Sequence, residues 1–222
     1  MKKIVLLLAL CAYLCPVLLE DALAETIKIV AFGDSGTWGS GRSNVTGRQG
    51  GIPVSESWPA KLERALQAKG WNVSVSNQGV PGQTAEAAVS TTDARVPPGT
   101  NLTIVQFGGN DRVAGASEEA IAADLAAIVG RLRAKGSAVI VMQVWGKSEA
   151  PAYPLVVQNS DLVAKWLIPV YVRDPSGKLR IRPEYDSGDG EHPNAAATDL
   201  IASSAVPDVE AVLLKTGFKP GR

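Results

Sequence analysis

Short apolar runs rich in β-branched residues alternate with helical patterns along this chain of 222 residues. The runs at residues 27–32, 73–76, 102–107 and 138–144 are typical of buried strands. Because strands and helices alternate, successive strands are joined by helical crossovers, which produce parallel strands with right-handed connections. The alternation therefore predicts a three-layer α/β/α sandwich around a mostly parallel, doubly wound central sheet.

Three segments carry helix signals, at residues 59–69, 118–135 and 195–214. The first places Leu62 and Leu66 on one face, and the second follows Ser117, a residue type that favours the N-cap position. In the third segment Pro207 is expected to kink or divide the helix, because proline removes a backbone hydrogen bond. Pro193 is expected at the first position of this last helix.

Segments rich in glycine, proline and polar residues are expected to form loops, at residues 36–55, 146–154 and 175–190. In doubly wound sheets, ligands bind beyond the carboxyl ends of the strands, where such loops gather. The functional site is therefore expected at that edge of the sheet.

Residues 1–24 have the pattern of a secretory signal peptide, and residues 25–222 are expected to form one domain. Lys2 and Lys3 precede an apolar run, which is followed by the small-residue cleavage pattern Ala22-Leu23-Ala24. The protein is therefore expected to be exported, to the bacterial periplasm or out of the cell.

A retained membrane anchor is the alternative to cleavage. The apolar run at residues 4–19 is shorter than the roughly 20 residues that a spanning helix needs, and it contains Pro16. Lipid attachment at Cys11 or Cys15 is disfavoured, because Leu precedes each cysteine where a small residue is expected. We therefore expect no stable membrane anchor.

Charge and metal-ligand content narrow the class of partner. The chain has 22 Lys and Arg residues against 22 Asp and Glu residues, so it lacks the excess positive charge that nucleic acids attract. One His and two Cys are too few for a His-rich or four-cysteine zinc site. We expect a small-molecule substrate, no nucleic-acid partner, no cofactor and no metal.

The first strand run ends in Gly33-Asp34-Ser35-Gly36. A serine on a turn from strand to helix is exposed at the sheet edge, where backbone N–H groups favour a nucleophile and its developing oxyanion. Taken alone, the tripeptide Gly33-Asp34-Ser35 is also compatible with an ordinary turn or an N-cap. Ser35 is the candidate nucleophile.

Two further strand ends supply candidate oxyanion donors. Phe107-Gly108-Gly109-Asn110-Asp111 follows the third run, and the Asn110 amide is a neutral donor suited to a carbonyl oxygen that becomes negative. After the second run, Gly82 lies in the segment at residues 80–84 and offers a backbone N–H. Each segment alone is also compatible with an ordinary turn.

The single histidine, His192, lies in the segment Asp189-Gly190-Glu191-His192. A turn over these residues brings the Asp189 carboxylate to Nδ1 and leaves Nε2 free to face a serine, as a general base requires. Asp186 and Glu191 are rival partners for the imidazole. An inert surface histidine is the alternative interpretation of a lone His.

Together these segments resemble the SGNH, or GDSL, hydrolases, and among them the small bacterial exported thioesterase, arylesterase and lysophospholipase type. The resemblance implies a flavodoxin-like fold and assigns Ser35 as the nucleophile, with Asp189 and His192 completing the triad. It also implies an oxyanion hole formed by the backbone of Ser35, by Gly82 and by Asn110.

The chain departs from the family pattern beside these residues. The usual Leu after the serine is Gly36, and the usual acidic or polar position after the second-block glycine holds Gln83. The loop at residues 39–52 is longer and richer in glycine than small family members carry, which is expected to reshape the acyl pocket. Trp38 and Trp145 are the candidate substrate-binding aromatics.

The expected activity is hydrolysis of carboxylic ester or thioester bonds through an acyl-enzyme. O-deacetylation of carbohydrate or cell-wall glycan is the alternative enzyme function, and a carbohydrate-binding module with an inactive site is the non-enzyme alternative. A dinucleotide-binding domain is disfavoured, because Gly39-Ser40-Gly41 lacks the third glycine at the required spacing.

Overall fold

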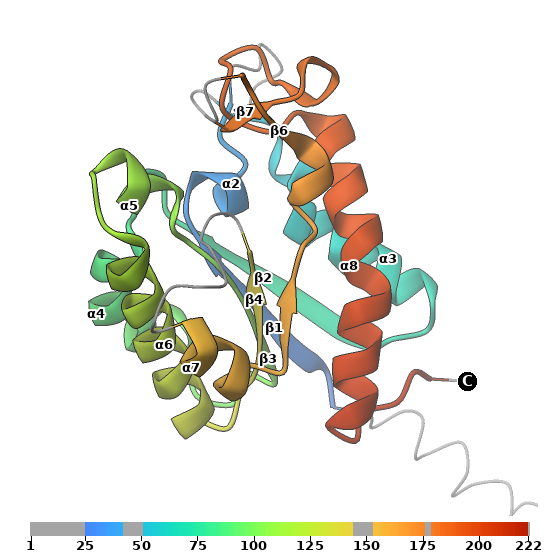
Figure 1. Ribbon diagram of the computed structural model, residues 1–222. Coiled ribbons are helices and arrows are strands. Elements are labelled where there is room, and N and C mark those ends of the chain that lie inside the picture. Colours follow the sequence, from blue (N-terminus) through green and yellow to red (C-terminus); the bar gives the residue numbers. More distant parts are fainter. Residues whose placement is uncertain (1–24, 42–50, 144–152, 176–178, 222) are drawn as a thin grey trace, which may run out of the picture.

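A five-stranded sheet in the order β2-β1-β3-β4-β5 forms the centre of the molecule (Figure 1). The computed structural model describes residues 25–41, 51–143, 153–175 and 179–221, so the expected signal peptide lies outside the described residues. All neighbouring strands are parallel, as the alternating pattern predicts. The strands are β1 Ile27–Gly33, β2 Val73–Gly79, β3 Leu102–Gln106, β4 Ala138–Met142 and β5 Leu162–Ala164.

Helices cover both faces of this sheet (Figure 1). Their bounds are α2 Ser35–Trp38, α3 Trp58–Ala68, α4 Ala85–Arg95, α5 Gly109–Val113, α6 Glu118–Ala134, α7 Tyr153–Asn159 and α8 Ala195–Lys215. Single 3-10 turns occur at Val54–Glu56, Ile168–Val170 and Pro183–Tyr185. The predicted three-layer α/β/α architecture is therefore confirmed.

Alternate side chains of β1 build the two halves of the core, because successive residues of a strand point to opposite faces. Ile29 and Ala31 belong to the apolar cluster that includes residues of α3 and α8. Val30 and Phe32 belong to the cluster that includes residues of α4, α6 and α7. β1 is thus buried on both faces, which explains why its sequence is a nearly continuous apolar run.

Two expectations about the last helix need correction. Pro207 does not divide this helix, since α8 continues from Ala195 to Lys215 with buried Val206 and Val209 on either side of the proline. The first residue of α8 is Ala195 rather than Pro193, since the Asn194 side chain caps the helix by accepting from the backbone N–H of Ala197. The helix α4 is not predicted from the sequence, because its small and polar residues give little helical periodicity.

The segment at residues 175–190 is more structured than a loop. It contains β7 (Leu179–Ile181), which pairs antiparallel with β6 (Tyr171–Arg173) to form a small hairpin, and the 3-10 turn at Pro183–Tyr185. Figure 1 places this hairpin next to α2, beyond the carboxyl end of the central sheet. The expected loop at residues 36–55 likewise includes most of α2 and the turn at Val54–Glu56.

In the part of the chain that the structure describes, no helix combines the length and the apolar character that a bilayer crossing requires.

Gly79 at the end of β2 tests how tightly the sheet edge packs against α2. A Cβ at this position would lie 2.7 Å from Cα of Trp38 and 2.9 Å from the carbonyl oxygen of Asp34, both rigid backbone atoms. We predict that Gly79→Ala lowers the free energy of unfolding by about 1 to 3 kcal/mol. The control is Gly130→Ala in α6, where a Cβ meets nothing within 4 Å, so it should gain roughly 0.5 to 1 kcal/mol. Equal stability of the two variants in urea unfolding would contradict this packing.

Candidate active site

The turn that follows β1 presents Ser35 at the first position of the short helix α2. The preceding Asp34 caps that helix, because one oxygen of its carboxylate accepts from the backbone N–H of Gly36 at 2.9 Å. The N–H of Asp34 in turn donates to the carbonyl of Gln106 at 3.2 Å, which continues the pairing of β1 with β3 past the strand end. Hydrogen bonds of the two neighbouring residues, Asp34 and Gly36, therefore fix the turn that carries the candidate nucleophile.

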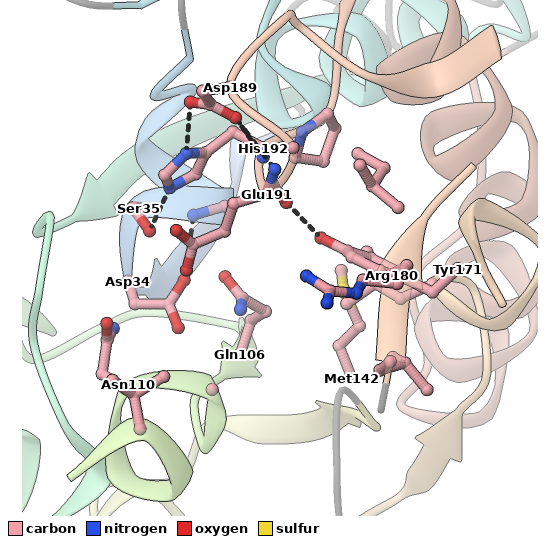
Figure 2. A pocket seen from close by; sticks show the side chains of 18 of the residues that line it. Asp34, Ser35, Gln106, Asn110, Met142, Tyr171, Arg180, Asp189, Glu191 and His192 are labelled. Carbon is pink, nitrogen blue, oxygen red and sulfur yellow. Dashed lines mark hydrogen bonds and ion pairs between the residues drawn. The ribbon is translucent and has the colours of Figure 1, made fainter. Parts of the chain in front are cut away.

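Ser35, His192 and Asp189 form a continuous hydrogen-bonded relay (Figure 2). Nε2 of His192 lies 2.9 Å from Oγ of Ser35, and Nδ1 lies 2.8 Å from Oδ2 of Asp189. Ser35 and His192 are separated by 157 positions in the chain. Tertiary structure thus brings together the three residues that were predicted as candidates from separate segments of the sequence.

The Asp189 carboxylate is fixed by its own loop. Its Oδ1 accepts from the backbone N–H groups of Glu191 at 3.0 Å and His192 at 2.8 Å, while Oδ2 faces the imidazole. Burial alone would raise the pKa of Asp189, but the hydrogen bonds from the backbone and ring of His192 and from Glu191 hold it below its usual value. The charged carboxylate is therefore the stable form beside the imidazole.

Asp186, the rival candidate for the partner of the imidazole, instead bonds to the backbone of its own loop. Its Oδ1 accepts from the backbone N–H groups of Gly188 at 2.8 Å and Gly190 at 3.0 Å, so it shapes the turn that carries Asp189. Glu191, the other rival, is exposed, and its backbone carbonyl accepts from the hydroxyl of Tyr171 at 3.2 Å. Of the carboxylates considered from sequence, Asp189 is the one bonded to the ring.

The candidate oxyanion donors come from the ends of β2 and β3. Asn110 lies in α5, and its Nδ2 donates to the carbonyl of Gln83 at 3.0 Å, next to Gly82. Gly82 adopts φ +77°, a left-handed conformation that suits glycine. Asn110 lines the same cavity as Ser35, whereas Gly82 is not among the described residues of its wall.

A cavity of about 390 Å³ lies beside the relay (Figure 2). Its polar part includes Asp34, Ser35, Gln106, Asn110 and His192, and its apolar part includes Trp58, Met142, Leu167, Leu179 and Ile181. Trp38 is absent from the described residues that line it, and Trp145 lies outside the described residues.

The β6–β7 hairpin and the residues around it form a wall that the sequence analysis missed. Tyr171 and Ile181, which pair across the hairpin, both line the cavity. Burial raises the pKa of the Tyr171 hydroxyl above its ordinary value, and the charges of Asp34, Glu191 and Asp189 act in the same direction. Alternation of apolar and charged residues at 179–182 is the sequence signal that could have revealed this strand.

Asp34 is a buried carboxylate between the relay and the sheet. Burial raises its pKa to about 6, although hydrogen bonds from the backbone of Gly36 and the side chain of Gln106, together with the charge of His192, act to lower it. The negative charge of Asp111 adds to the increase. Asp34 is therefore ionised at neutral pH at a cost in stability.

Within the described ranges, the His, Cys, Asp and Glu side chains form no group of three or more that could hold a metal ion.

Comparisons with known proteins agree with this geometry. The model of the GDSL-like lipase/acylhydrolase family matches residues 31–200. An arylesterase from Vibrio mimicus is 25% identical over 206 residues, which cover 88% of this chain and 93% of that protein.

Two solved structures extend the comparison. AlinE4, an SGNH-hydrolase family esterase, is 27% identical with a TM-score of 0.59, and the match covers 86% of this chain and 98% of AlinE4. The structure of TesA has a TM-score of 0.65 at 20% identity, with 84% of this chain and 99% of TesA covered. At that identity the TesA comparison shows the shared fold.

The raised pKa of Asp34 predicts how stability depends on pH. A carboxyl whose pKa is higher in the folded state, about 6 against 3.8, contributes stability below pH 3.8 that is lost as the pH rises through 6. Asp34→Asn removes the buried charge, so we expect it to raise the free energy of unfolding by up to about 3 kcal/mol at pH 7.5 and to have little effect at pH 3.5. Urea unfolding at both pH values measures this difference.

The matched control is Asp93→Asn. Asp93 is exposed, and its pKa is lowered first of all by a hydrogen bond from Lys135, so this substitution should reduce stability at pH 7.5 instead of raising it. A loss of stability at pH 7.5 in the Asp34→Asn variant would contradict the assigned pKa.

Proposed function

This chain belongs to the GDSL-like lipase/acylhydrolase family and is an enzyme of the GDSL/SGNH esterase type, and from that premise we propose that it hydrolyses carboxylic esters through an acyl-enzyme on Ser35. The observation that carries this proposal is the relay from Ser35 Oγ through both ring nitrogens of His192 to Asp189, with distances of 2.9 and 2.8 Å. The relay borders a cavity large enough for a small ester.

In the first half-reaction, Oγ of Ser35 attacks the ester carbonyl carbon while Nε2 of His192 takes the hydroxyl proton. Asp189 accepts a hydrogen bond from Nδ1 and stabilises the imidazolium that forms. The carbonyl oxygen becomes an oxyanion, for which the N–H groups of Ser35 and Gly82 and the amide of Asn110 are the proposed donors.

The tetrahedral intermediate collapses when the carbon–oxygen bond to the leaving group breaks and His192 returns its proton to that oxygen. Water then attacks the acyl-enzyme with His192 again as general base, which releases the acid and restores Ser35. Ser35 and His192 are the only residues that exchange a proton in this mechanism, since Asp189 stays ionised and the oxyanion donors supply hydrogen bonds alone.

The comparisons and the cavity support a proposal for the substrate class. The named relatives are an arylesterase and esterases, and the apolar wall at Met142, Leu167 and Ile181 offers space for a short acyl group. We place aryl esters and acyl thioesters first and carbohydrate acetates second. Residues 1–24 serve, in this proposal, as a signal peptide that directs the enzyme out of the cytoplasm.

Hydrolysis of p-nitrophenyl acetate, with identification of the residue modified by an organophosphonate, tests the function. We expect turnover that survives EDTA, labelling at Ser35 alone, and loss of both turnover and labelling in Ser35→Ala. Labelling at another serine with turnover retained in Ser35→Ala would overturn the proposal. Acyl-CoA and acetylated xylan, assayed beside the ester, distinguish the substrate classes.

The pair Asp189→Ala and Asp186→Ala provides an internal control for this experiment. Asp189→Ala leaves the serine and the oxyanion donors in place but removes the group that orients the imidazole, so we expect a partial loss of kcat. Asp186→Ala loosens the turn through Gly188 and Gly190 and should have the smaller effect. The reverse order of effects would exclude Asp189 as the partner of His192.

Asn110 tests the proposed oxyanion hole. If its amide donates to the oxyanion, the bond is stronger in the transition state than in the ground state, so its removal lowers kcat more than it changes KM. One such donor is typically worth about 2.7 to 4 kcal/mol, or roughly 100 to 1,000-fold in kcat.

The expected result for Asn110→Ala is therefore a slow, folded enzyme whose KM changes only a few-fold and whose Ser35 still reacts with the phosphonate. The alternative role is structural, through the bond to the Gln83 carbonyl. That role predicts a lower unfolding temperature with kcat nearly intact, so kinetics and thermal unfolding measured together separate the two.

A further inference from the structure

The floor of the cavity beside the nucleophile is polar. Gly36, Asp34 and Gln106 all line the cavity, and we call these three residues the polar floor. A Cβ at residue 36 would lie 3.3 Å from Oε1 of Gln106 and 3.4 Å from Oδ1 of Asp34. The two polar side chains thus lie directly under the glycine that replaces the family's usual Leu.

The polar floor makes fewer hydrogen bonds to the described residues than its side chains can form. Oε1 of Gln106 accepts from the Thr37 hydroxyl at 2.7 Å, and the Gln106 side chain also bonds to Asp34. An amide NH₂ has two N–H donors and a carboxylate has about four acceptor positions, so the bonds to described residues leave one donor of Gln106 and lone pairs of Asp34 for a ligand. Both side chains belong to residues that are only 4% exposed, so a ligand reaches them through the cavity.

The position of the polar floor relates it to the acyl side of an ester. His192 must protonate the leaving-group oxygen, so the leaving group lies toward the imidazole. Figure 2 shows His192 above Ser35 and Asp34 below it, with Gln106 beside Asp34. Ser35 and the polar floor line the same cavity, so the second or third carbon of a short acyl group on Ser35 is the part of the chain that we expect to meet the floor.

We propose that the polar floor of Gly36, Asp34 and Gln106 is a subsite for a hydroxyl group on the second or third carbon of a short acyl chain. This inference rests on the proposed function and names its substrate class as hydroxyacyl esters. The hydroxyl donates to the Asp34 carboxylate and accepts from the free N–H of Gln106. The raised pKa of Asp34 agrees with this assignment, because its main cause is burial of the carboxylate, and a further donor from a ligand hydroxyl would stabilise the charged form.

The test compares esters of equal shape that differ only in hydroxyl against methyl. The p-nitrophenyl esters of (R)- and (S)-3-hydroxybutyrate are measured against 3-methylbutyrate, and those of 2-hydroxybutyrate against 2-methylbutyrate. Each kcat/KM is divided by the rate of spontaneous hydrolysis, which removes the intrinsic reactivity of the ester. For wild type we expect at least one hydroxylated ester to be preferred by about tenfold, the size of a hydrogen bond to a charged group.

Two variants remove the subsite in different ways. Gln106→Met replaces the amide with an apolar chain of similar length. Gly36→Ala places a methyl group over the floor, and it fits the backbone because Gly36 is not among the glycines with positive φ. In both variants the corrected kcat/KM of the hydroxylated ester, divided by that of its methyl counterpart, should be close to one, even if both rates change.

The matched controls are Gln67→Met and Gly130→Ala. Gln67 donates to the carbonyl of Val73 and Gly130 lies in α6, and neither residue lines the cavity, so both variants should keep the ratio of wild type. Thermal unfolding shows whether each variant folds. If one of the two subsite variants does not fold, the ratio measured in the other one tests the proposal.

A wild-type ratio near or below one for every pair would overturn the subsite, as would a preference that survives in every folded subsite variant. Loss of the preference in either variant, with both controls unchanged, supports it. If wild type hydrolyses none of these esters and no p-nitrophenyl acetate, the proposed function fails instead. The two hypotheses are therefore distinguished by the unsubstituted ester.

Discussion

The parallel pairing of β1 with β3 is the interaction on which the site depends. The register places Gly33 opposite Gln106, and the backbone bond from Asp34 to the Gln106 carbonyl adds one more contact beyond the strand ends. The chain leaves β1 toward α3 on one face and leaves β3 toward α6 on the other, so the two connections diverge and leave a crevice between them. Ser35 and Asn110 face this crevice because each follows one of these strands.

Buried polar groups next to the crevice make it costly to rearrange the ends of β1 and β3. Asp34, Thr37 and Gln106 are almost fully buried and are bonded to one another or to the adjacent backbone. A buried polar group that loses its partner costs about 1 to 3 kcal/mol, and more if it is charged. This network of hydrogen bonds therefore favours one arrangement of the turn that carries Ser35. Because Gly36 has no side chain, the Asp34 and Gln106 side chains remain open to the cavity.

The Asp189–His192 loop reaches the crevice from far along the chain, and its position is set by α8. Asn194 caps that helix, and its backbone N–H donates to the Tyr185 carbonyl at 2.8 Å. The buried Lys61 of α3 donates to the Ala195 carbonyl at 2.7 Å and pairs with Asp199, so α3 and the first turn of α8 are joined. His192, the proposed general base, is thus anchored to the helix layer that packs on β1.

Much of the fold could be predicted from the sequence because its signals are local. The apolar runs identified β1 to β4, and the periodic apolar residues and caps identified α3, α6 and α8. The missed elements have weak local signals. β5 has three residues, α4 is rich in alanine and polar residues, and β7 lies in a segment whose glycine and proline content favours a loop.

The sequence by itself determined which residue types were available for catalysis: a serine after the first strand, an asparagine after the third, and a single histidine three residues after an aspartate. Tertiary structure decided that Asp189 rather than Asp186 contacts the ring, that Ser35 lies 2.9 Å from Nε2, and that Asp34 and Gln106 form the cavity floor. The reason is physical. Residue types and strand periodicity are properties of short segments, whereas the direction of a carboxylate and the burial of a side chain depend on contacts between segments far apart in the chain.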